Sequence, residues 1–94
     1  MSEPAPSFVA ECFWPGVTEQ DVRLLGDRIR AAVAQLDGDG RALRYSGSLF
    51  MTTDEVVLCV FEGSEELVRR VAEQAAVPFD RIVQSLADLG PTLP

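Results

Sequence analysis

A short apolar run near the middle of the chain constrains the fold most. Residues Val56 to Phe61 are apolar without interruption, and six residues fall far below the roughly 18 that a membrane helix needs. Successive side chains of a strand point to opposite faces, so a strand formed by this run is apolar on both. A half-exposed strand alternates with polar residues instead. The run therefore predicts a strand whose two faces are both covered.

Hydrophobic periodicity and turn residues divide the rest of the chain into alternating elements. The predicted strands are Phe8–Trp14, Arg41–Met51, Glu55–Glu62 and Arg81–Leu86. One predicted helix follows Thr18 and has apolar residues recurring from Val22 to Leu36, and the other follows Ser64 and has an apolar stripe from Leu67 to Ala75. Thr18 and Ser64 precede the helices and are suited to cap them. Asp37–Gly40 ends the first helix and Pro78 ends the second, because glycine favours a helix C-terminus and proline cannot continue a helix.

The resulting order, β-α-β-β-α-β, predicts an α+β fold of the ferredoxin-like type. Right-handed crossovers place both helices on one face of a four-stranded antiparallel sheet. The other face, here called the open face, is then free, while the third strand is apolar on both sides. We therefore expect a homodimer that covers the open face.

Length and charge limit the classes of function. The 94 residues suffice for one domain, expected over 8–88, with flexible segments at 1–7 and 89–94. A formal net charge of −7 repels phosphate backbones, so nucleic acid is not an expected partner. The N-terminal segment lacks the basic region of a signal peptide, and no run can span a membrane. We expect a cytoplasmic protein.

The short turn at Thr52–Asp54 predicts how the second and third strands pair. It places Tyr45 near Phe61, Gly47 near Cys59 and Leu49 near Val57. Adding alternate residues of the first strand gives one expected apolar cavity on the open face, lined by Val9, Phe13, Gly47, Leu49, Val57, Cys59 and Phe61. The predicted ligand is a hydrophobic small molecule.

Glu11 is the one acidic residue that this arrangement places in the cavity. A carboxyl group among apolar side chains can act as an acid or base near neutral pH, so Glu11 is a candidate catalytic residue, with Tyr45 as a phenol donor. Alternatively, Glu11 lies near the end of the sheet, solvated or paired with Arg44 or Arg81. The two cysteines, Cys12 and Cys59, are expected to be small buried apolar residues.

Four segments resemble a known family. They are Pro15-Gly16-Val17-Thr18, Arg44-Tyr45-Ser46-Gly47-Ser48, Leu58-Cys59-Val60-Phe61-Glu62 and Pro78-Phe79-Asp80-Arg81-Ile82-Val83. Together they resemble small bacterial domains of unknown function typified by a nickel-binding ferredoxin-like protein. The resemblance spans about Phe8 to Val83. It implies a ferredoxin-like fold, homodimers built through the sheets and, in some members, nickel bound by histidine.

The chain departs from this family at the metal. Many relatives carry histidine at about the position of Gly47, whereas this chain has no histidine. We therefore expect no metal and no cofactor, and space beside Gly47 for an organic ligand. The first functional hypothesis is a homodimeric small-molecule-binding domain. The alternatives are a small enzyme of the cyclase or isomerase type that uses Glu11 as acid and base, and a nickel-binding protein.

Overall fold

The computed structural model describes residues 6–36 and 42–85, which form four strands and two helices in the predicted order. The elements are β1 (Ser7–Phe13), α1 (Glu19–Ala34), β2 (Leu43–Met51), β3 (Val56–Gly63), α2 (Glu65–Gln74) and β4 (Arg81–Ser85). The expected ferredoxin-like α+β architecture is thereby confirmed.

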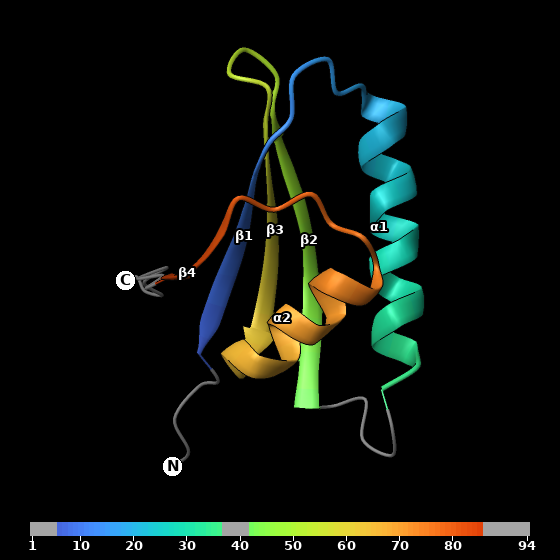
Figure 1. Ribbon diagram of the computed structural model, residues 1–94, viewed down its shortest axis with the longest axis vertical. Coiled ribbons are helices and arrows are strands. Elements are labelled where there is room, and N and C mark those ends of the chain that lie inside the picture. The colour runs from blue at the N-terminus through green and yellow to red at the C-terminus, as the bar shows by residue number, and fades with distance from the viewer. Residues whose placement is uncertain (1–5, 37–41, 86–94) are drawn as a thin grey trace, which may run out of the picture.

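The strands form one antiparallel sheet in the order β2-β3-β1-β4. Helix α1 runs alongside β2, and α2 packs over β1 and β3 (Figure 1). The core lies between the helices and one face of the sheet. Its largest fully buried side chains are Phe61, Leu25, Ile29, Leu43, Val57, Val68, Val71, Cys12 and Cys59.

Both helices begin at the predicted caps. The Thr18 hydroxyl accepts a hydrogen bond from the Asp21 amide at 3.1 Å, and the Asp21 carboxylate accepts one from the Thr18 amide at 2.9 Å. This reciprocal capping box satisfies two amides that have no partner within the helix. The Ser64 hydroxyl likewise accepts from the amide of Leu67 at 3.2 Å.

Several element boundaries differ from the predictions by one or two residues; for example, Trp14 follows β1, α1 ends at Ala34 and α2 ends at Gln74. Ser7 belongs to β1, so the predicted N-terminal segment 1–7 is one residue too long. Glu55 lies in the turn before β3 with φ of 56°, which is incompatible with the extended strand backbone predicted for it. The predicted helix stop at Asp37–Gly40 and the tail 89–94 lie outside the described residues.

Neither helix of the described residues is long and apolar enough to cross a membrane.

Candidate functional site

The two faces of the sheet carry different residues from those predicted. On β3, Val57, Cys59 and Phe61 are fully buried beneath the helices. The alternate residues Val56, Leu58 and Val60 are half-buried and lie on the open face. The predicted cavity is therefore wrong in its membership, because Val57, Cys59 and Phe61 belong to the core.

The pairing of β1 with β3 explains this error. Val9 pairs with Val60 and Glu11 pairs with Leu58, and directly paired residues share a face of the sheet. Val9, Glu11 and Phe13 thus lie on the open face, as predicted, but with the other set of β3 side chains. Helix α1 and strand β2 lie between β1 and β3 in the chain, so no hairpin turn reveals the register of these two strands.

A β-bulge in β2 changes the pairing of the second and third strands. Tyr45 pairs with Phe61 as predicted, but from Gly47 onward the register shifts by one, so Gly47 pairs with Val60 and Leu49 with Leu58. The expected pairs of Gly47 with Cys59 and of Leu49 with Val57 are wrong. Gly47 has φ of 129°, which glycine adopts most readily. Leu49 remains on the open face, whereas Tyr45 faces the helices.

Glu11 forms an ion pair across the neighbouring strand. Its Oε1 lies 2.6 Å from Nε of Arg81, and the two residues pair directly between β1 and β4. This is the structural alternative foreseen for Glu11. Since Tyr45 lies on the other face of the sheet, Glu11 and Tyr45 do not meet around one cavity, and the enzyme hypothesis is left without its acid–phenol pair.

The open face is a largely apolar surface that also carries the Glu11–Arg81 ion pair, with Glu11 on the interior strand β1 beside Leu58. Phe13, Leu49 and Met51 are strongly exposed, with Phe13 at 62% and Leu49 at 58%. Val9, Val56, Leu58, Val60 and Val83 complete the surface and are half-buried. Large side chains exposed singly are ordinary, but a contiguous patch indicates a binding surface.

The bulge leaves a hollow at the β2 side of this surface. Its volume is about 240 Å³, and Ser46, Gly47, Ser48, Leu49 and Val60 line it. No atom lies within 4 Å of the place that a side chain on Gly47 would occupy. The predicted space beside Gly47 is therefore present, with Val60 rather than Cys59 as its neighbour.

On the helix face, the side chains of Tyr45, Ser48 and Cys59 form a hydrogen-bonded chain that extends into the core. The hydroxyl oxygens of Tyr45 and Ser48 are 2.5 Å apart, and Ser48 donates to Sγ of Cys59 at 3.4 Å. Cys12 belongs to the same buried cluster as Cys59, and its thiol donates to the carbonyl oxygen of Ala10 at 4.0 Å. Both thiols are fully buried and free of any disulfide.

The two thiols respond in opposite ways to each other. The contact with the Cys12 thiol lowers the pKa of Cys59 against the opposing effect of burial, and Ser48 lowers it further. The pKa of Cys12 is raised strongly, first by the contact of its thiol with Cys59 and then by burial. A negative charge on Cys59 raises it further, because two thiolates side by side repel. A thiolate formed in this pair therefore resides on Cys59. Neither sulfur is exposed, so the pair is inert toward external reagents while the fold is intact.

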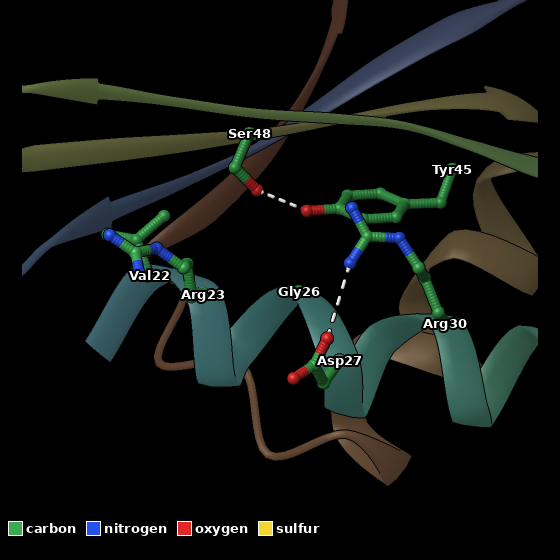
Figure 2. A pocket seen from close by; sticks show the side chains of 7 residues that line it. All are labelled: Val22, Arg23, Gly26, Asp27, Arg30, Tyr45 and Ser48. Carbon is green, nitrogen blue, oxygen red and sulfur yellow. Dashed lines mark hydrogen bonds and ion pairs between the residues drawn. The ribbon is translucent and has the colours of Figure 1, made fainter. Parts of the chain in front are cut away.

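A second hollow lies between α1 and β2, at the outer end of this chain. Its volume is about 390 Å³. Figure 2 shows Tyr45 and Ser48 projecting from the sheet and Arg23, Asp27 and Arg30 projecting from the helix. The guanidinium carbon of Arg30 lies 5.3 Å from the centre of the Tyr45 ring, within the range of a cation–π contact.

The sequence analysis did not select this second hollow. One signal was available, since Gly26 interrupts the apolar helix pattern at a position where glycine weakens a helix. The contribution of Ser48 could not be found in the same way, because without the bulge it would face away from Tyr45.

In the ranges 6–36 and 42–85, no three histidine, cysteine, aspartate or glutamate side chains gather closely enough to hold a metal ion. The nickel-binding alternative therefore has no ligand cluster in this part of the chain.

Fold and surface together define a ferredoxin-like α+β domain with an apolar open face. A crystal structure of SCO4226 from Streptomyces coelicolor A3(2) has the same fold, with a TM-score of 0.70, 19% sequence identity, and coverage of 87% of this chain and 98% of that one. No protein-family model matches the chain, and the curated proteins gave no match.

Proposed function

We propose that the chain is a homodimeric small-molecule-binding domain. A second copy covers the open face, and the two copies enclose an apolar ligand at the hollow beside Gly47. The observation that carries the proposal is the contiguous apolar surface around Leu49 and Val60, which is hollowed at the bulge. Covering one large apolar side chain stabilises an assembly by about 1.5–3 kcal/mol.

Charge supports a second copy as the occupant of this surface. The chain carries a net charge of −7, so most pairs of surfaces repel. The charged residues of the strands, however, are Glu11 with Arg81 and Arg44 with Glu62, and their charges cancel. A two-fold dimer requires a self-complementary surface. A largely apolar face whose few charges are paired within one copy meets that requirement.

The free thiols suit a reducing compartment. Disulfides persist in oxidising surroundings, whereas adjacent free cysteines are ordinary in the cytoplasm. We infer a cytoplasmic location, supported by the free, unbridged thiols of Cys12 and Cys59.

The dimer is tested by light scattering coupled to gel filtration at micromolar concentration. The wild type is expected at twice the mass of one chain. Leu49→Glu places a charge on the open face, beside the hollow at its β2 side, and is expected to be monomeric. Leu24→Glu is the matched control, because Leu24 is also exposed, at 47%, but lies on α1; it is expected to remain dimeric.

Ligand binding is tested on the same three proteins with the apolar dye Nile red. A saturable rise in fluorescence is expected for the wild type and for Leu24→Glu, and none for Leu49→Glu. A monomeric wild type, or a Leu49→Glu variant that dimerises and binds the dye normally, contradicts the proposal.

A further inference from the structure

The hollow between α1 and β2 lies on the opposite face of the sheet from the surface discussed above. It is polar where the open face is apolar, so the two sites stand independently of each other. Its volume of about 390 Å³ lies in the usual range for small-molecule sites.

The arginines around this hollow favour a small anion. Arg23 and Arg30 line it together with a single acid, Asp27, and Glu19 pairs with Arg23, so two guanidiniums beside two carboxylates offer an anion hydrogen-bond donors in a chain whose net charge is −7. Among residues 6–36 and 42–85, each guanidinium is paired only with an exposed acid on the same helix: Arg23 lies 3.0 Å from Glu19, and Arg30 lies 3.6 Å from Asp27. Exposed pairs of this kind are weak, so an incoming carboxylate can compete for the arginines.

Hydrogen bonding adds a second recognition element to the same place. The Ser48 hydroxyl donates a hydrogen bond to Sγ of Cys59. In its short contact with Tyr45, the Ser48 oxygen therefore accepts a hydrogen bond from the phenol hydroxyl. The lone pairs of the Tyr45 oxygen are then left as acceptors. Because Tyr45 also lines the hollow, the phenol oxygen is suited to receive a hydrogen bond from a ligand.

Gly26 leaves room between the two groups that would recognise the ligand, the guanidinium of Arg30 and the hydroxyl of Tyr45. A side-chain carbon at this position would lie 3.1 Å from Nη1 of Arg30 and 3.6 Å from the Tyr45 hydroxyl. One point above the helix is therefore flanked by a cationic donor and a phenol acceptor. The glycine keeps that point open, at the expense of the helix stability that alanine would provide.

We propose that this hollow binds a small hydroxycarboxylate, with its carboxylate on the guanidinium of Arg30 and its hydroxyl donating to the Tyr45 oxygen. The two groups of such a molecule are a few ångströms apart, which matches the spacing of the two protein groups around Gly26. Arg23 supplies additional hydrogen-bond donors at the side of the hollow.

Three related probes test the proposal by titration followed in amide NMR spectra. Mandelate carries a carboxylate and a hydroxyl on adjacent carbons, phenylacetate lacks the hydroxyl, and mandelamide lacks the charge. Mandelate is expected to shift the amides of residues 22–30 and 45–48 saturably. Phenylacetate is expected to bind about fivefold more weakly, because one neutral hydrogen bond is lost. Mandelamide is expected to bind at least about tenfold more weakly, because a charge-assisted contact is lost.

Two variants and one control locate the contacts. Arg30→Gln is expected to weaken mandelate binding about tenfold. Tyr45→Phe keeps the ring packed on Phe61 and is expected to remove the preference for mandelate over phenylacetate, since the acceptor oxygen is gone. Arg69→Gln is the control, because Arg69 forms a similar exposed pair with Glu65 on α2; its binding is expected to be unchanged.

Four results would overturn the proposal: no saturable binding of mandelate, equal binding of mandelamide, shifts outside the two named segments, or a mandelate preference that survives Tyr45→Phe. Each of these leaves the dimer and its dye site untouched. Conversely, a monomeric wild type that binds mandelate as described overturns only the proposed function.

Discussion

The hydroxyl oxygens of Tyr45 and Ser48 lie 2.5 Å apart on one face of β2, although the residues are three positions apart in a strand. Residues at odd separations in a regular strand point to opposite faces. The extra residue of the bulge between Tyr45 and Gly47 reverses that alternation. The polar chain from the α1–β2 hollow to Cys59 therefore exists because of one inserted residue.

Ionisation of Tyr45 reports directly on the contact between the Tyr45 and Ser48 hydroxyls. It is the single tyrosine of the chain, so ultraviolet absorbance of tyrosinate follows it alone. Burial raises the pKa of Tyr45, opposed by the Ser48 hydroxyl, which can turn to donate to the phenolate. We expect a midpoint above the ordinary value of about 10 and a still higher one in Ser48→Ala.

The same shift predicts a loss of stability in alkali. A raised folded pKa means that the folded state holds the phenol proton more tightly than the unfolded state does. The contribution is fully present below pH of about 10 and is lost as pH rises through the folded pKa. Urea melts across that window check the sign. A midpoint below 10 in the titration would contradict the burial of Tyr45.

Gly26→Ala is expected to stabilise the protein. Alanine within a helix is more stable than glycine by about 0.5–1 kcal/mol. The new methyl group would meet Nη1 of Arg30 at 3.1 Å, but this is the end of a flexible side chain that can move aside. Urea melts should give a higher free energy of unfolding, while mandelate binding weakens. A loss of stability would mean that Arg30 cannot move.

Replacing Glu11 tests its pairing with Arg81. Their contact of 2.6 Å predicts that Glu11→Gln and Arg81→Gln each lower the melting temperature slightly. The double variant should lose less than the two single losses added together, because the two residues share one interaction. A Glu11→Gln variant more stable than the wild type near neutral pH would instead indicate an unfavourably desolvated carboxylate.

The buried thiols predict resistance to alkylation. Cys12 and Cys59 are both fully buried, so iodoacetamide at about pH 8, where an exposed thiol reacts readily, should label neither in the folded protein. Mass spectrometry should show both labelled together on unfolding in urea. Rapid labelling of one thiol in the native protein would show that the core opens locally beside it.

Much of the fold is predictable from local patterns in the sequence. Thr18 and Ser64 mark the helix starts, and the apolar spacing of Leu25 and Ile29 marks the buried face of α1. These features are legible because each depends on residues a few positions apart.

The candidate site was predicted less well, for two physical reasons. The register of β1 against β3 depends on packing between strands that are distant in sequence. Residues near Val9 therefore do not indicate that Val9 pairs with Val60. The bulge shifts every residue after it, and Ser46-Gly47 is the sole local sign of it. Because of these two effects, Cys59 was predicted on the open face where Leu58 lies, and the contact of Ser48 with Tyr45 was not predicted.

The bulge also limits how the sheet can grow. In the described part of the chain, β2 has a hydrogen-bonded neighbour on one side only, and a long free strand edge is a template for another chain to add to. If two copies paired through these edges, they would need an uninterrupted ladder of backbone hydrogen bonds. The irregular residues at Ser46 and Gly47 break that ladder near the middle of β2. The distortion that joins Tyr45 to Ser48 thereby also protects the protein from open-ended, fibre-like polymerisation along this edge.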